Sequence, residues 1–427
     1  MPSLLESGSL RASRQVLLIA LILVGFGTVI VYSSSSVLAG NRFSDTGFFL
    51  ERQLFRALLG LALMFGASRV PLAVWRKLAR PLLLAGLGLL VLVLLMGVGR
   101  GTQRWLPVPV PLVRAGLSFQ PSEFVKLVLV VYLADVLVRK GDSLAEWKAG
   151  FLPRVAVIAG VLLLILLQPD LGTATAIGAV SVVMLWLGGA RTAQVASLGL
   201  AAVPVGVISL VRSPYQLERL MSFLHGADPQ GAGFQVNQSL LALGSGGLLG
   251  VGLGNSIQKY YLPEAHTDFV FAFVGEELGL FGTLSVLALL AALAIHGVLI
   301  ARHASTDHGY LLAAGITIMI TANAMINMGV ATGLLPTTGL PLPFISYGGS
   351  SLVWNLTAVG ILAGVAREQR LAGAAVPPAE DGPPPGGSAG RPLTRRRSGA
   401  RLANVGLTRR SRGTMVRRLD RPRPWRP

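Results

Sequence analysis

Long apolar runs recur along the first 370 residues and are separated by short polar segments. They cover residues 16–38, 54–70, 81–98, 121–138, 151–168, 170–189, 193–211, 268–301, 309–335 and 347–366. Because a helix needs about 20 apolar residues to cross ~30 Å of hydrocarbon, each run predicts one transmembrane helix. The runs are continuous rather than alternating, which excludes a membrane β-barrel. The pattern predicts an all-α polytopic membrane protein with about ten transmembrane helices.

The composition agrees with this pattern. Of the 427 residues, 52% are hydrophobic and 13% are charged, and the mean hydropathy is +0.64. The first run follows Arg11 and Arg14, as in a signal peptide, but it is too long for a signal's apolar core and predicts a span. The chain contains no cysteine, which excludes disulfides, cysteine-ligated zinc and a thiol nucleophile.

Most of the net charge of +18 comes from the residues after Gly364, which contribute +11 of it. Residues 371–427 are rich in proline, glycine and arginine and have few apolar residues with which to form a core. We expect a disordered basic tail that is attracted to anionic lipid at the cytoplasmic face. Nucleic-acid binding is the less favoured alternative for such a segment, and we expect no nucleic-acid partner.

Lysine and arginine residues predict the orientation of the bundle. They gather in two loops on one side, as Arg69, Arg76, Lys77 and Arg80 and as Arg139, Lys140, Lys148 and Arg154. By the positive-inside rule, these loops and both termini, including residues 1–15, are cytoplasmic. The arginines that count against this bias are Arg42, Arg52, Arg56, Arg100, Arg104 and Arg114.

The opposite side holds residues 213–267, between the seventh and eighth predicted helices. This segment is too apolar to be disordered and too long for an ordinary connection. Its glycines cluster between Gly244 and Gly254, and glycine permits bends and close backbone approach. We predict a structured extracytoplasmic loop that contains short or re-entrant helices packed on the bundle.

Ionisable residues within predicted spans are costly and usually face a cavity or a partner. Glu123 and Lys126 lie at the start of a span, and their i, i+3 spacing places them on one helix face. This pair either only locks neighbouring helices together or forms the polar wall of a substrate cavity, in which Lys126 would meet phosphate.

Asp268 lies where the long loop meets the next span, in the run His266-Thr267-Asp268-Phe269. Water and an amphiphilic substrate could both reach a carboxylate there, but Thr267 or Asp268 could equally cap the helix. From spacing alone both interpretations stay open. Asp170, in a tight turn between two spans, is the predicted N-cap of the second of them.

Residues 335–351 combine prolines and glycines between two spans. They predict a broken or re-entrant element that helps to line a cavity. The five histidines show no convincing metal-ligand spacing, so we expect no metal site made by protein ligands alone.

Five segments carry a more specific pattern. They are QPSEFVK at 120–126, QPDLGT at 168–173, ALGSGGLLGVGLGN at 242–255, LPEAHTDFVFAFVGEELG at 262–279 and GLPLPFISYGGSS at 339–351. In this order they resemble the SEDS family (shape, elongation, division and sporulation) of bacterial cell-wall polymerases over residues 16–370. Residues 32–35 and 327–343 are more similar to the division branch of the family than to its elongation branch.

The resemblance implies a peptidoglycan glycosyltransferase that polymerises lipid II outside the cytoplasmic membrane, with Asp268 as its essential carboxylate. We expect Asp268 to act as general base on the acceptor hydroxyl. Lys126, Arg104 or Arg219 would stabilise the leaving group, with or without a divalent cation (Mg or Mn) held on the substrate pyrophosphate. The candidate substrate-binding residues are Lys126, Glu123, Arg104, Trp105, Arg219, Gln120, Ser122 and His266.

The resemblance also implies partners and a place in the cell. They are a class B penicillin-binding transpeptidase and other membrane proteins of the division machinery, at the septum. Three alternatives stay open. An elongation polymerase would have the same motifs, a lipid II transporter or flippase would also combine many spans with buried charge, and a scaffold for a division complex would need no catalysis.

Overall fold

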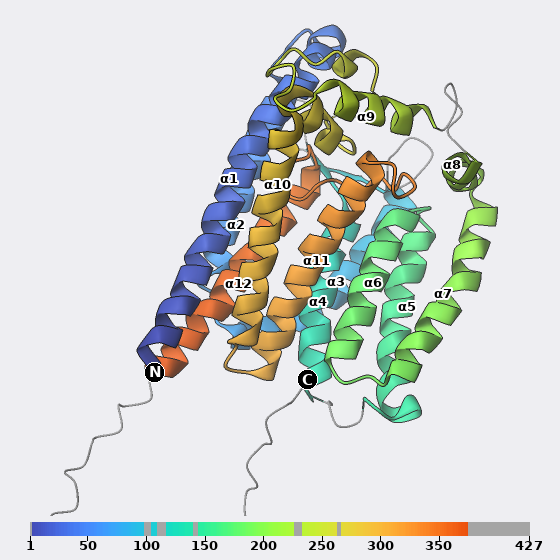
Figure 1. Cartoon of the computed structure of the whole chain (residues 1–427). Helices are drawn as coiled ribbons and strands as arrows, with labels where there is room; N and C mark the ends of the chain where they lie inside the picture. Colours follow the sequence, from blue (N-terminus) through green and yellow to red (C-terminus); the bar gives the residue numbers. More distant parts are fainter. Residues whose placement is uncertain are drawn as a thin grey trace, which may run out of the picture. The chain divides into compact units, whose positions relative to one another are not determined.

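The computed structural model describes residues 2–97, 104–108, 117–139, 144–225, 233–262 and 266–374 (Figure 1). The predicted basic tail lies outside the described residues, except that the last helix continues to Ala374. Arg100, Arg114 and Lys140, which entered the prediction of orientation, also lie outside them.

The described chain is almost entirely helical. Its elements are α1 (Pro2–Phe43), α2 (Phe48–Ala67), α3 (Leu72–Met96), β1 (Leu106–Val108), β2 (Leu117–Phe119), α4 (Pro121–Arg139), η2 (Trp147–Phe151), α5 (Leu152–Leu166), α6 (Leu171–Leu187), α7 (Thr192–Arg212), α8 (Pro214–His225), α9 (Phe234–Ser245), η3 (Gln258–Tyr260), α10 (Val270–Arg302), α11 (Asp307–Ala331) and α12 (Gly349–Ala374). Every predicted apolar run falls on a helix, so the all-α prediction is confirmed.

Among the described helices, seven are long and apolar enough to cross a membrane. They are α1, α3, η2 with α5, α7, α10, α11 and α12. The three remaining predicted spans fall on α2, α4 and α6. Of these, α6 has only 17 residues, whereas α2 and α4 carry buried charges such as Arg56 and Lys126. Charged residues lower the mean hydropathy of a helix, and those inside a membrane bundle usually have a functional role.

The helical bundle has two ends that differ in structure (Figure 1). At the terminal end, α1 begins and α12 ends. The loop end carries α8, α9 and the irregular segment 332–348. α12 is the most enclosed span, with 94% of its apolar window buried. At the terminal end, the backbone N–H of Leu72 donates to Glu368 Oε1 at 2.6 Å, so α12 supplies the carboxylate that caps α3.

A short antiparallel pair of strands connects α3 with α4 at the loop end. Leu106 lies opposite Phe119 and Val108 opposite Leu117. Proline is favoured in the first turn of a helix because its missing N–H is not needed there, and Pro121 accordingly begins α4. The pairing thus holds Trp105, which precedes β1, close to the start of α4.

The predicted structured loop is confirmed. It contains α8 and α9, followed by a glycine-rich strap, residues 246–258, which lies against a break in α10. At that break Gly279 has a φ of 65°. The N–H of Val251 donates to the carbonyl of Glu276 at 3.0 Å, and that of Leu280 donates to Gly247 at 2.9 Å. The strap therefore supplies partners for backbone groups that the break would leave unpaired.

Two buried carboxylates fasten the strap. Glu276 Oε1 accepts the backbone N–H groups of Ile257 at 2.8 Å and Gln258 at 3.1 Å. Glu277 Oε1 accepts the Ser33 hydroxyl of α1 at 2.7 Å and the N–H of Gly254 at 2.8 Å. Because their oxygens accept hydrogen bonds within the protein, these two acidic residues position the loop on α1 and α10.

Replacing Gly250 by alanine should prevent the strap from reaching α10. Its φ is +81°, and an added Cβ would overlap the carbonyl oxygen of Glu277. No side-chain movement relieves a clash with backbone, so we expect a loss of more than about 4 kcal/mol of stability. Thermal melting in detergent would measure it. Gly254 is the matched control, because it has a φ of +82° but open space around it; an equal loss for Gly254→Ala would contradict the role of the contact.

Candidate active site

Asp268 lies at the loop end, in the turn that precedes α10, and is half-buried. The N-cap position of α10 is Phe269, whose side chain makes no capping hydrogen bond. Phe269, rather than Thr267 or Asp268, thus occupies the N-cap position. Partial exposure leaves the Asp268 side chain accessible to a ligand at this end of the bundle.

The main chain of Asp268 is held from α11. The Asn327 side chain donates to the carbonyl of Asp268 at 2.8 Å and to that of Leu340 at 2.7 Å. The N–H of Tyr347 donates to the carbonyl of His266 at 2.8 Å. These bonds join the turn before α10 to the segment 332–348, whose predicted irregular structure is confirmed.

Residues 337–339 meet three elements that lie far apart in the sequence. The Thr337 carbonyl accepts the Arg219 guanidinium of α8 at 3.5 Å. The Thr338 carbonyl packs so closely on Gly172 of α6 that a Cβ there would overlap it. A Cβ on Gly339 would lie 3.7 Å from Asp268 Oδ2. Residues 337–339 therefore lie next to both Asp268 and Arg219, two predicted site residues, and next to the turn at residues 168–173.

Arg104 clamps the turn between α5 and α6. Its guanidinium donates to the carbonyl of Gln168 at 2.9 Å and to that of Pro169, and it lies 3.8 Å from Asp170 Oδ1. Trp105, beside it, is half-buried. Because these contacts occupy the Arg104 guanidinium, it positions the turn in this structure.

Asp170 caps α6, as predicted. Its carboxylate accepts the N–H of Thr173 at 3.2 Å, and the residue is 3% exposed. The Gln216 amide of α8 donates to the neighbouring Pro169 carbonyl at 2.5 Å. The α5–α6 turn is thus held from one side by Arg104 and from the other by α8.

Glu123 and Lys126 form a buried ion pair on α4, as their spacing predicted. The Lys126 Nζ lies 2.7 Å from Glu123 Oε1, and the two residues are 4% and 3% exposed. The contact has poor angles for a hydrogen bond, and Lys126 Nζ makes none with any described group. A buried ammonium with unused donors is costly unless a ligand or water completes its shell.

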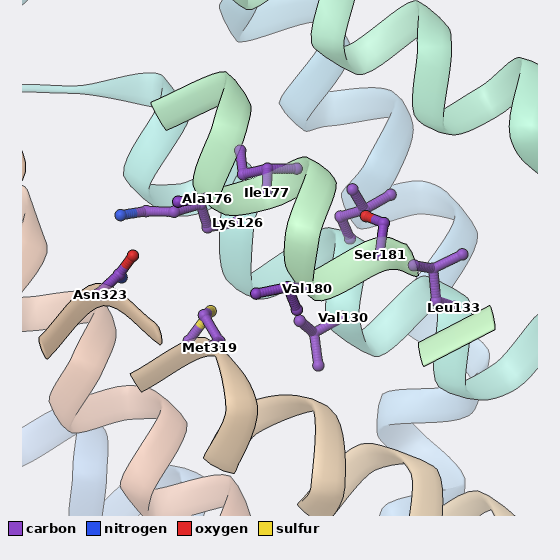
Figure 2. Close-up of a pocket in the computed structure, with 10 residues that line it drawn as sticks. Lys126, Val130, Leu133, Ala176, Ile177, Val180, Ser181, Met319 and Asn323 are labelled. Atoms are coloured by element: carbon purple, nitrogen blue, oxygen red, sulfur yellow. The ribbon is translucent and has the colours of Figure 1, made fainter. Parts of the chain in front are cut away.

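The ammonium lines a narrow cavity with Asn323 of α11. Figure 2 shows the ends of the Lys126 and Asn323 side chains facing each other, and Asn323 Oδ1 also lacks a partner among the described groups. The open volume is about 10 Å³, enough for one water molecule. Asn323 lies one helical turn from Asn327, so α11 connects this cavity with the backbone of Asp268.

The remaining predicted residues lie around these two places. The N–H of Gln120 donates to the Ser350 hydroxyl of α12 at 2.7 Å. The buried Ser122 hydroxyl has no partner among the described groups. The His266 ring is buried, with its centroid 5.4 Å from that of Tyr347.

Two buried arginines on α2 were missed as site residues and counted only as exceptions to the charge bias. Arg52 and Arg56 are 6% and 4% exposed. The Arg56 guanidinium lies 4.8 Å from the centre of the Tyr347 ring, and its Nη1 has no partner among the described groups. The sequence offered a signal for Arg56, which lies inside the predicted run 54–70, because a charge there costs at least ~2.5 kcal/mol on insertion scales.

The donor set does not fit a resident metal ion. Within the described ranges, no three His, Asp or Glu side chains are grouped so that they could ligate one. The polar residues that line the cavity are Lys126, Ser181 and Asn323, which supply no carboxylate or imidazole ligand, and an ammonium repels a cation.

Replacing Asn327 by alanine should lower activity through Asp268. The carbonyls of Leu340 and Asp268 would lose their donor, which costs about 1–3 kcal/mol for a buried group such as that of Leu340, and a shift of Asp268 by about 1 Å could cost ~10²-fold in rate. Glycan polymerisation and thermal melting measure the two effects. Asn355→Ala is the matched control, since its amide donates to the Ser351 carbonyl of α12 at 2.8 Å. If both variants lost rate equally, the positioning role of Asn327 would be wrong.

Seven of the described helices are long and apolar enough to span a membrane, and charged residues such as Lys126 and Glu123 are buried inside the bundle. The protein is therefore a multi-pass α-helical membrane protein with an internal polar site. The family model of cell cycle proteins that covers FtsW, RodA and SpoVE matches residues 13–371. The chain belongs to this family, and the resemblance stated from the motifs is confirmed.

Curated relatives are similar over nearly their whole lengths. The probable peptidoglycan glycosyltransferase FtsW of Geobacter sulfurreducens is 44% identical over 369 residues, which cover 85% of this chain and 97% of the relative. Stage V sporulation protein E of Bacillus subtilis is 43% identical over 361 residues, covering 83% of this chain and 97% of the relative.

Solved structures share the fold. A chain from a peptidoglycan synthase complex, described as structurally coordinating polymerization and crosslinking, is 30% identical with a TM-score of 0.67, covering 83% of this chain and 97% of that one. The rod shape determining protein RodA of Thermus thermophilus is 29% identical with a TM-score of 0.61, covering 83% and 96%.

Proposed function

We propose that the chain is a peptidoglycan glycosyltransferase that polymerises lipid II during septal cell-wall synthesis. The observation that carries this proposal is the half-buried Asp268, whose main-chain carbonyl accepts a hydrogen bond from Asn327 of α11. One helical turn along α11 from Asn327, Asn323 lines a cavity with the buried Lys126 ammonium, which has no hydrogen-bond partner among the described groups. The names of the FtsW relatives and the structural likeness to RodA support the same reaction class.

The reaction requires one group that accepts a proton and one that accommodates an anion. The acceptor sugar's 4-hydroxyl attacks C1 of the donor sugar, and the bond from C1 to the lipid diphosphate breaks. Asp268 takes the hydroxyl proton as general base. The departing diphosphate gains negative charge, which Lys126 and Arg219 would stabilise. An apolar route between helices would accommodate the lipid tail, which stays in the bilayer.

The cellular setting is part of the proposal. The chain would lie in the cytoplasmic membrane with both termini inside and act at the division septum beside a class B penicillin-binding transpeptidase and other division proteins. A divalent cation, Mg or Mn, would accompany the substrate pyrophosphate. A fluorescent fusion that localised along the side wall rather than at midcell would favour the elongation alternative.

Purified full-length protein incubated with labelled lipid II tests the reaction class. The expected product is a glycan ladder, with the transpeptidase partner added in a parallel reaction. In proteoliposomes, movement of lipid II across the bilayer without polymer would show a flippase. Neither product, with or without the partner, would show a scaffold.

A further inference from the structure

A second hollow lies at the terminal end, at the opposite end of the bundle from the candidate active site. It has a volume of about 510 Å³, within the ~300–1,000 Å³ of small-molecule sites. It is open to one side and is lined by the start of α3, the end of α4, the end of α10 and the start of α11. Its polar lining comprises Arg76, Arg302, Ser305, Thr306, Asp307, His308 and Tyr310.

The charges around this hollow do not cancel. The buried Asp135 carboxylate accepts Arg139 Nε at 2.8 Å to both oxygens, and Arg76 Nε lies 3.3 Å from one of them. Asp307 also lines the hollow, and so does Arg302. Three guanidinium groups thus face two carboxylates, which leaves one positive charge in excess. The Arg76 side chain is 40% exposed and Arg302 is exposed, so both can reach a ligand.

The first turn of α11, whose residues line the hollow, adds backbone donors at its edge. Thr306 is the N-cap of this 25-residue helix, and its hydroxyl accepts the N–H of Gly309 at 3.1 Å. The N–H groups that precede Gly309 in the first turn have no partner within the helix and carry its positive dipole.

His308 provides an independent indication of a ligand. The residue is 2% exposed, lines the hollow, and has no hydrogen-bond partner for either ring nitrogen among the described groups. In either tautomer one nitrogen carries a proton to donate. A buried imidazole with both nitrogens unpaired is costly unless something in the hollow bonds to it.

We propose that this hollow binds a phosphate group, carried either by a phospholipid headgroup or by a free phosphate compound. Guanidinium groups, hydroxyls and a helix N-terminus arranged around one space suit a tetrahedral anion with several acceptor oxygens. The ends of transmembrane helices lie at the depth of lipid headgroups. The arginine-rich residues 371–427 are an unsuitable ligand for this hollow, because the hollow already has excess positive charge.

Binding to full-length protein in detergent, after removal of native lipid, tests the proposal. One arm measures retention of phosphatidylglycerol by native mass spectrometry, and the other titrates inorganic phosphate by calorimetry. Arg302→Gln removes a charge-assisted contact and should weaken binding about tenfold or more. Ser305→Asp adds a negative charge at an exposed position that is not needed for packing, and it should weaken binding similarly.

Arg69→Gln is the matched control. Arg69 is exposed at the same end, bonds to the Phe65 carbonyl at 3.1 Å and does not line the hollow. Binding in either arm that both hollow variants weaken and Arg69→Gln preserves would support the proposal, and the responding arm would identify the source of the phosphate. Binding to neither probe, or equal binding by all three variants and the unmodified chain, would overturn it.

Discussion

Lys126→Met should destabilise the protein by about 3–5 kcal/mol, because it leaves the carboxylate of Glu123 buried without its partner. The expected loss follows from geometry, since both residues are at most 4% exposed and their charged atoms lie 2.7 Å apart. Thermal melting in detergent, with lipid II polymerisation measured on the same preparation, gives stability and rate together. On its own, this variant cannot separate a structural ion pair from a substrate-binding cation.

The double variant Glu123→Leu/Lys126→Met makes that separation. Replacing both partners of a buried pair with apolar residues is often neutral or stabilising, so melting should return close to that of the unmodified chain. If Lys126 stabilises the leaving diphosphate, polymerisation should still fall by about 10²–10³-fold. If the double variant melts normally and polymerises at the original rate, the Glu123–Lys126 pair does not bind substrate and only holds neighbouring helices together.

The sequence predicted the parts of the site that depend on local spacing. The apolar runs predicted the helices, and the i, i+3 interval predicted that Glu123 and Lys126 lie side by side. The position of Asp170 after a proline, in the turn before a span, predicted that it caps the next helix. Each of these follows from the period of one helix or the chemistry of one helix end. Such rules operate within a few residues and need no knowledge of what packs against the element.

The contacts that build the site across elements could not be predicted in this way. Asn327 holds a carbonyl 59 residues away, and residues 337–339 lie between α6, α8 and Asp268. Irregular backbone has no period from which its neighbours follow. The charge pattern was also ambiguous, because Arg56 counted against the predicted orientation, whereas the structure places it in the interior against Tyr347.

Asp268→Asn should abolish polymerisation while the protein remains folded. The general base contributes about 10²–10⁴-fold, and an amide cannot take the acceptor hydroxyl's proton. The fold should survive because Asn327 bonds to the main-chain carbonyl of Asp268 rather than to its carboxylate, and that bond is independent of the side chain. The side chain is also half-buried, so the nearly isosteric change leaves no cavity. Glycan product from labelled lipid II, together with melting temperature, measures both expectations.

Asp45→Asn is the matched control for this substitution. Asp45 lies between α1 and α2, and its Oδ1 accepts the N–H of Gly47 at 2.9 Å, a bond that the asparagine oxygen can also accept. Its rate should therefore match that of the unmodified chain. Polymerisation retained by Asp268→Asn would remove proton abstraction by this carboxylate from the mechanism. Loss of melting cooperativity would instead give the carboxylate a structural role, because the main-chain clamp alone would then not hold the turn before α10.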